Sequence, residues 1–141
     1  MPAELFLDTS AWFPLLGRRH PDHARVAAAL RQRRRAGARV LTTNLVVAET
    51  HALLLSRVHR AAALAFLRQV GLAGELVVSS TPELELRARQ DWLERSADQD
   101  FSLADAVSFA LMSERGMREA LTLDRHFAAA GFVVVPGDAA R

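Results

Sequence analysis

Short apolar runs alternate with longer amphipathic segments along most of this 141-residue chain, and this alternation limits the folds open to it. Strands that alternate with helices form a parallel sheet covered by helices on both faces. We therefore predict an α/β fold with a five-stranded parallel sheet. The predicted strands cover residues 4–8, 39–43, 75–79, 119–123 and 132–135. The predicted helices cover residues 8–16, 21–36, 44–59, a segment from there to 70, 81–95, 102–115 and 124–130.

The length and composition predict one domain over residues 1–141, large enough to bury a core. The chain has no Cys, which excludes disulfides and zinc–thiolate sites. We read no signal peptide and no apolar stretch long enough to cross a membrane, so we expect a soluble cytoplasmic protein.

All 18 basic residues are Arg, and the formal net charge is only +2. The high pI of 10.8 reflects the absence of Lys, Tyr and Cys rather than a basic patch. The charge is nevertheless uneven, because the segment Arg18–Arg39 holds eight Arg with only Asp22 in opposition. This segment is either a surface that contacts a polyanion such as RNA or a solvated helix face.

Four acidic residues stand beside or within apolar runs: Asp8, Glu49, Asp105 and Asp124. A carboxylate withdrawn from water must be paired, protonated or bound to a metal ion. Basic side chains are scarce around these positions, and only Arg125 is an immediate neighbour. A shared divalent cation is the simplest explanation.

The predicted elements bring these acids together. Asp8 ends one predicted strand and Asp124 follows another, and ligands bind at the carboxyl ends of the strands in parallel sheets. Asp105 falls in the first turn of a helix and Glu49 in the second turn of another. Simpler roles remain open, because Asp8 and Asp124 could be helix N-caps and Asp105 could form a capping box with Ser102.

Carboxylate oxygens suit Mg²⁺ or Mn²⁺, held as one ion or as two. Such a centre can activate water and stabilise a leaving oxygen, so the predicted reaction is metal-assisted hydrolysis of a phosphodiester. Asp98 and Asp100 lie in a polar loop and are expected to be mostly solvated.

At these acids the chain resembles the PIN-domain family, and within it the VapC-type toxins of bacterial toxin–antitoxin pairs. Any one of the motifs is weak, but the four occur in the family's order and span nearly the whole chain. The motifs are Leu7-Asp8-Thr9-Ser10-Ala11-Trp12, Thr43-Asn44-Leu45-Val46-Val47-Ala48-Glu49-Thr50, Asp100-Phe101-Ser102-Leu103-Ala104-Asp105-Ala106-Val107-Ser108-Phe109-Ala110 and Leu121-Thr122-Leu123-Asp124-Arg125-His126-Phe127.

The resemblance implies a three-layer α/β/α sandwich and a Mg²⁺- or Mn²⁺-dependent endoribonuclease. It implies that Asp8 and Asp105 are the principal metal ligands, and that Asp124 and Glu49 complete the site directly or through water. Ser10 and Thr122 match small hydroxyl residues that support the acids.

The resemblance also implies a homodimer held inactive by a cognate VapB-like antitoxin. A segment of that antitoxin would pack in a groove near the active site. The predicted helix pair at residues 44–70 could line such a groove, although ordinary core packing is the simpler role for any one residue there.

Two other fold families also gather functional groups at the edge of a parallel sheet. A phospho-receiver domain needs a Lys near its acids, and this chain has none. A P-loop hydrolase needs a Gly-Lys-Ser/Thr loop, which is also absent. A PIN nuclease outside toxin systems and a non-catalytic PIN module that binds RNA or protein remain as alternatives.

Overall fold

A computed structural model describes residues 3–137. Its centre is a five-stranded sheet in which every neighbouring pair is parallel, with the order β3-β2-β1-β4-β5. The strands are β1 (Glu4–Leu7), β2 (Arg39–Thr43), β3 (Leu76–Val78), β4 (Glu119–Leu121) and β5 (Val133–Val135). The predicted sheet is therefore confirmed, with β2 matching the predicted bounds and the other strands slightly shorter.

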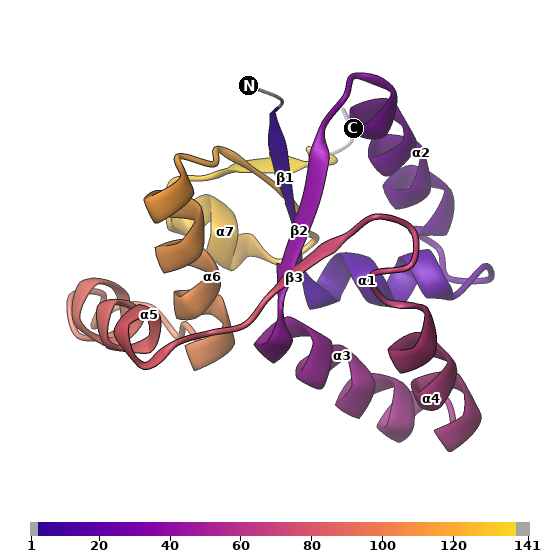
Figure 1. Cartoon of the computed structure of the whole chain (residues 1–141), viewed down its shortest axis with the longest axis horizontal. Helices are drawn as coiled ribbons and strands as arrows, with labels where there is room; N and C mark the ends of the chain where they lie inside the picture. Colours follow the sequence, from indigo (N-terminus) through magenta and orange to yellow (C-terminus); the bar gives the residue numbers. More distant parts are fainter. Residues whose placement is uncertain (1–2, 138–141) are drawn as a thin grey trace.

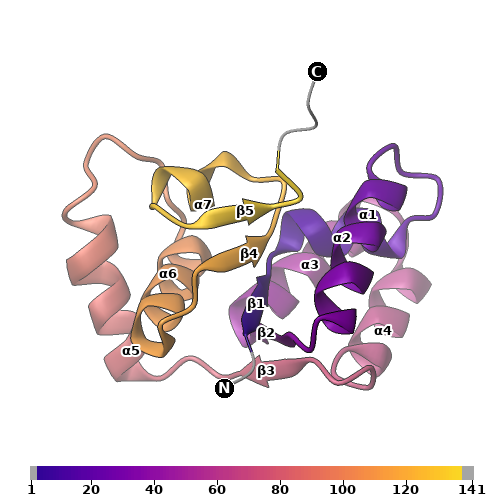
Figure 2. The ribbon, with the colours of Figure 1, turned by 90° about the horizontal axis from the view of Figure 1, so that it is seen from above.

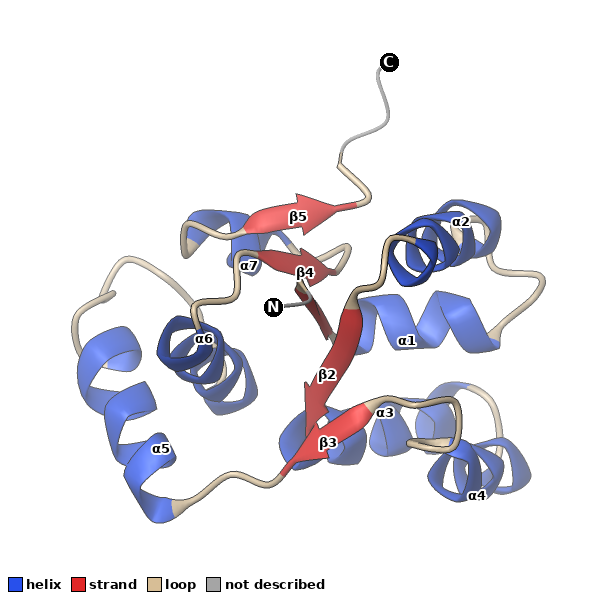
Figure 3. Ribbon diagram, turned by 45° about the horizontal axis from the view of Figure 1, so that its top comes forward, coloured by secondary structure: helices blue, strands red, loops and turns tan. Residues whose placement is uncertain are grey.

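Helices cover both faces of this sheet. They are α1 (Thr9–Leu16), α2 (His23–Arg35), α3 (Asn44–Arg57), α4 (Arg60–Gln69), α5 (Pro82–Arg87), α6 (Leu103–Arg115) and α7 (Arg125–Ala129), and a π-helical turn, η1 (Ala88–Leu93), continues α5. Figures 1 and 2 show α5, α6 and α7 on one side of the sheet, and α1, α2 and α4 on the other. In Figure 3, α3 starts where β2 ends and passes behind β3. The predicted three-layer α/β/α architecture is confirmed.

The helix starts follow the side chains that cap them. Thr81 accepts a hydrogen bond from the Leu84 backbone N–H, with Pro82 in the first turn of α5. Asn44, the first residue of α3, is not its cap; the Thr43 hydroxyl caps the helix by accepting from Val46 N–H. Asn44 instead accepts a hydrogen bond from Ser80 N–H at 2.8 Å, which ties the start of α3 to the segment after β3.

The segment predicted as one helix over residues 81–95 changes its hydrogen-bond pattern partway. α5 ends at Arg87, and η1 continues it with wider π-type turns. Such a bulge is not visible in a periodic apolar pattern, because the chain keeps the same general direction. The Trp92 side chain of η1 then packs against Phe109 of α6, with ring centroids 5.1 Å apart.

The core includes side chains from the sheet, from α6 and from the helices α1 to α4. Leu5, Phe6 and Leu7 of β1 are fully buried, as expected for a central strand of a parallel sheet. α6 is buried continuously from Asp105 to Met112, so its start, which carries Asp105, is fixed by packing along most of its length. Within the described residues, no helix is long and apolar enough to cross a membrane.

Candidate metal centre at the carboxyl edge of the sheet

Asp8 lies immediately beyond β1 and caps α1. Its side chain is buried, and its Oδ2 atom accepts hydrogen bonds from the Ser10 hydroxyl at 2.9 Å and the Thr122 hydroxyl at 3.0 Å. In the part of the chain that the structure describes, the hydrogen bonds of this carboxylate fall on Oδ2. A cation bound by Asp8 would therefore have to use its second oxygen, Oδ1.

Ser10 and Thr122 join two segments that are far apart in the sequence. The Ser10 hydroxyl accepts from Leu123 N–H at 2.9 Å, and the Thr122 hydroxyl accepts from Asp124 N–H at 2.9 Å. Each hydroxyl thus donates to Asp8 and accepts from the loop after β4. This network holds the loop, and Asp124 with it, against the end of β1.

Asp105 is buried at the start of α6. It forms a capping box, in which Ser102 accepts from Asp105 N–H and the Asp105 carboxylate accepts from Ser102 N–H at 3.1 Å. Asp105 therefore does cap α6, as the sequence left open, but this does not prevent its carboxylate from also binding a metal ion. The same oxygen, Oδ2, lies 3.0 Å from His126 Nδ1.

Asp124 caps α7 by accepting from His126 N–H at 2.9 Å. The capping role is again real, and His126 Nδ1 lies 3.4 Å from Asp124 Oδ1. One ligand atom each of Asp105, Asp124 and His126 lie within 4.8 Å of one another, a spacing that could hold a metal ion. The sequence alone gave His126 no role, although it lies in the same motif as Asp124. Its position two residues after Asp124, at the start of a short helix, was the signal that could have assigned one.

Glu49 differs from the other three acids. Because its neighbours in the sequence are apolar, Glu49 was expected to be withdrawn from water. Its side chain is instead exposed, whereas Val46 and Thr50 of the same helix are buried. The helical repeat therefore places Glu49 at the rim of the site. Its pKa is still raised, first by partial desolvation of the carboxyl and then by the charges of Asp105 and Asp124, while a hydrogen bond with Thr9 opposes the shift. These charges place Glu49 within electrostatic reach of the acids.

The acidic site is electrostatically costly without a cation. Burial raises the pKa of Asp8 from 3.8 to about 6, the nearby charge of Asp105 adds to the rise, and the hydrogen bonds from Ser10 and Thr122 oppose it. Divalent cations such as Mg²⁺ and Mn²⁺ favour carboxylate oxygens. The Oδ1 atom of Asp8, the two further aspartates and the raised pKa fit such an ion. Asp98 and Asp100 are exposed in the loop before α6.

The raised pKa of Asp8 predicts a pH-dependent loss of stability in the metal-free protein. The folded pKa lies above the unfolded value, so the stabilising contribution is complete below about pH 4 and is lost as the pH rises through about 6. The shift corresponds to about 3 kcal/mol. Urea unfolding in EDTA measures the free energy of unfolding of Asp8→Asn and of the wild type. The difference in favour of Asp8→Asn should grow by an amount of this order between pH 4 and pH 7. A difference that stays constant over this range would show that Asp8 titrates normally.

Two arginines of the arginine-rich segment form ion pairs at the amino end of the sheet. Arg33 forms a two-bond ion pair with Glu119 at the start of β4, and Arg34 lies 3.3 Å from Glu75. This end of the sheet is opposite the acids, since Asp124 lies five residues beyond Glu119, about 15 Å away along an extended chain. Charge reversal at Arg33–Arg35 would therefore break structural ion pairs as well as any contact with RNA.

The PIN domain family matches residues 5–133. The chain is 37% identical, over 132 residues, to the 23S rRNA-specific endonuclease VapC20 of Mycobacterium tuberculosis, covering 93% of this chain and 97% of that protein.

Solved structures give the same assignment. The crystal structure of Mycobacterium tuberculosis VapC20, a Sarcin-Ricin loop cleaving toxin, matches with a TM-score of 0.80 and 33% identity, over 92% of this chain and 96% of that one. VapBC2 from Rickettsia felis, bound to a DNA fragment from its promoter, shares the fold with a TM-score of 0.66 at 9% identity, over 93% and 96% of the two chains. With its five-stranded parallel sheet and its acids gathered at one edge, the chain belongs to the PIN-domain family and is of the VapC type.

Proposed function

We propose that this protein is a metal-dependent endoribonuclease and the toxin of a VapBC-type toxin–antitoxin pair. The observation that carries the proposal is the arrangement of Asp8, Asp105 and Asp124, from three separate segments, at the carboxyl edge of the sheet: Thr122 connects Asp8 to Asp124, and His126 lies between Asp105 and Asp124. A buried carboxylate with a raised pKa beside two further aspartates is what a divalent-cation centre requires.

The residues would share the work as follows. Asp8 and Asp105, the most buried acids, would be the principal ligands of Mg²⁺ or Mn²⁺, and Asp124 would complete the site. Glu49, exposed at the rim, is placed to hold or orient a water molecule. Ser10 and Thr122 fix the orientation of Asp8. The bound ion would activate water and stabilise charge on the cleaved phosphodiester.

The proposed substrate is ribosomal RNA, with the sarcin–ricin loop of 23S rRNA as the first candidate. The support is the 37% identity, over nearly the full length of both proteins, to an endonuclease named for that RNA. Because the substrate is RNA, we also propose that the protein acts in the cytoplasm. A PIN nuclease for another RNA would cut elsewhere, and a non-catalytic PIN module would not cut.

The direct test incubates the purified protein with deproteinised 23S rRNA and with intact ribosomes, in Mg²⁺ or Mn²⁺. Primer extension then maps any new 5′ ends. We expect one dominant cut in the sarcin–ricin loop, lost in EDTA on the deproteinised RNA. Metal-dependent cuts at other positions would retain the nuclease and reject this substrate. Intact RNA under all conditions would reject the enzyme.

RNA phosphates are proposed to lie beside Asp124, along a hollow of about 530 Å³ that is lined by Arg25 and Arg125 together with Thr122. We expect Arg25→Ala with Arg125→Ala to weaken RNA binding and to reduce the salt slope by about one for each phosphate that is no longer neutralised. The measurement is the RNA dissociation constant as a function of KCl concentration. Arg118→Ala, at an exposed position directly before β4 at the opposite end of the sheet, is the control. If its slope falls as much, the phosphates lie elsewhere.

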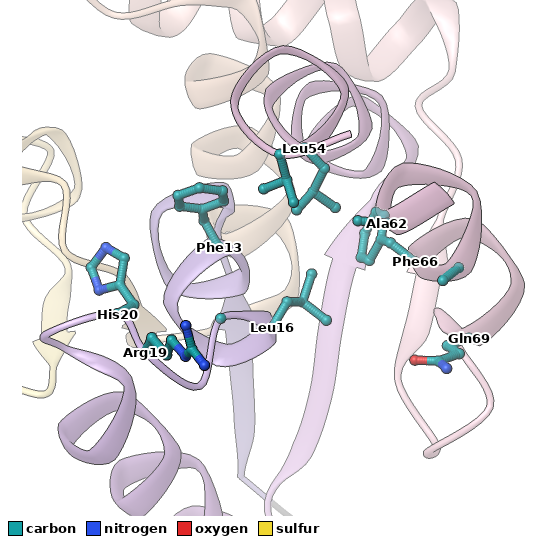
Figure 4. A pocket seen from close by; sticks show the side chains of 11 residues that line it. Phe13, Leu16, Arg19, His20, Leu54, Ala62, Phe66 and Gln69 are labelled. Atoms are coloured by element: carbon teal, nitrogen blue, oxygen red, sulfur yellow. The ribbon is translucent and has the colours of Figure 1, made fainter. Parts of the chain in front are cut away.

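The antitoxin is proposed to bind an apolar groove of about 430 Å³ between α1, α3 and α4. Figure 4 shows Phe13, Leu54 and Phe66 around this groove, and Arg19 and His20 also line it. The helix pair at residues 44–70 does contribute to a groove, as the sequence suggested, and α1 supplies the other wall.

Leu16 lines this groove and is 39% exposed, so Leu16→Asp should prevent co-purification with a VapB-like partner while the fold is kept. Leu72→Asp, on an exposed turn, should leave co-purification with the partner unchanged. Equal co-purification of both variants would place the partner on another surface. The homodimer that the resemblance implies stays a prediction.

A further inference from the structure

His126 is the side chain at the acidic edge that the proposed function does not yet use. It is mostly buried, and its Nδ1 atom lies between two of the acids, 3.0 Å from Asp105 Oδ2 and 3.4 Å from Asp124 Oδ1. The Phe101 ring packs against it edge to face at 5.4 Å. The imidazole is therefore held with one particular nitrogen facing the carboxylates.

These distances match neighbouring ligands of one metal ion. In an octahedral shell with ligand bonds of about 2.1 Å, adjacent ligand atoms stand ~3 Å apart. The Nδ1–oxygen distances of 3.0 and 3.4 Å are close to that spacing. An ion that enters the site can therefore contact Nδ1 and both carboxylates without a large movement of His126.

We infer that His126 is a nitrogen ligand of the metal centre and makes it select Mn²⁺ over Mg²⁺. The inference rests on the proposed function, since it adds a ligand to the same centre. Without metal, Nδ1 can hydrogen-bond an ionised Asp105 carboxylate only as the N–H donor, so an ion bound at Nδ1 replaces that proton and leaves a neutral ring with its proton on Nε2. Imidazole nitrogen binds first-row transition ions well, whereas Mg²⁺ prefers oxygen. A site of carboxylates alone would lack this preference.

The ligand can be detected without any enzymatic assay. Mn²⁺ bound to the metal-free protein is measured by pulsed electron paramagnetic resonance, which reports hyperfine coupling to a ligating histidine nitrogen. We expect this coupling in the wild type and its loss in His126→Phe, which keeps a ring against Phe101. Calorimetric titration should show the affinity of His126→Phe for Mn²⁺ reduced about tenfold, with a smaller change for Mg²⁺.

Two kinds of variant separate the possible failures. His59→Asn is the matched histidine control, because an Asn can keep the cap that His59 gives to α4, and the nitrogen coupling should remain. The wild type could bind Mn²⁺ without any nitrogen coupling, and Asp105→Asn could lose that binding. This result would overturn the role of His126 and leave the metal centre intact. Mn²⁺ binding unchanged in both Asp8→Asn and Asp105→Asn would overturn the centre itself, and the proposed function with it.

Discussion

Asp8→Asn is expected to lower the rate of RNA cleavage by about three orders of magnitude while leaving the protein folded. Electrostatic stabilisation by a bound metal ion is worth several kcal/mol, and each 1.36 kcal/mol is a factor of about ten in rate. The Asn amide oxygen can still accept the hydrogen bonds from Ser10 and Thr122, so the loop after β4 should stay in place. The rate is measured with the RNA in excess at saturating Mn²⁺.

The matched control is Asp91→Asn, which removes an exposed carboxylate from η1. This variant should cleave at the wild-type rate. A modest loss of activity in Asp8→Asn, no larger than that of the control, would remove Asp8 from the metal centre. A large loss accompanied by unfolding would contradict the expectation that the variant gains stability in the absence of metal at neutral pH.

Phe109→Ala is expected to destabilise the protein by about 3–5 kcal/mol. Phe109 is fully buried, and its ring lies within 6 Å of those of Trp92, Phe101, Phe127 and Phe132. Removing it leaves a cavity that four aromatic neighbours from different segments cannot fill together. Against a typical total of about 5–15 kcal/mol, the loss is large. Urea unfolding at constant pH, with metal absent, measures it.

The same cluster supports the site, because α6 carries both Phe109 and Asp105, and Phe101 packs on His126. Phe109→Ala should therefore weaken metal binding as well. Leu72→Ala, at a side chain that is 79% exposed, should change stability by less than about 0.5 kcal/mol. A loss below about 1 kcal/mol in Phe109→Ala would show that the aromatic cluster is loosely packed.

The sheet could be predicted from the sequence because each strand is a short apolar run bounded by helix starts. The convergence of Asp8, Asp105 and Asp124 followed from the same pattern, since parallel strands place their carboxyl ends at one edge. The cap at Ser102 and the end of α6 at Gly116 were also visible, because capping depends on local side-chain chemistry.

Other features depended on contacts between distant segments and could not be predicted. The ion pairs of Arg33 with Glu119 and Arg34 with Glu75 form across the fold, and they changed the interpretation of the arginine-rich segment. The exposure of Glu49 follows from which side of α3 faces the core, a choice that its mostly apolar neighbours leave open. His126 meets Asp105 only because α7 packs beside α6.

The central claim is that the acids at the carboxyl edge hold one divalent-cation centre, and anomalous diffraction from crystals soaked in Mn²⁺ tests it most directly. We predict an anomalous peak between Asp8 Oδ1, Asp105 and Asp124, with Glu49 on its rim. The peak should disappear in Asp105→Asn crystals. Well-ordered crystals with Mn²⁺ bound elsewhere on the protein, and no peak among these carboxylates, would contradict the account.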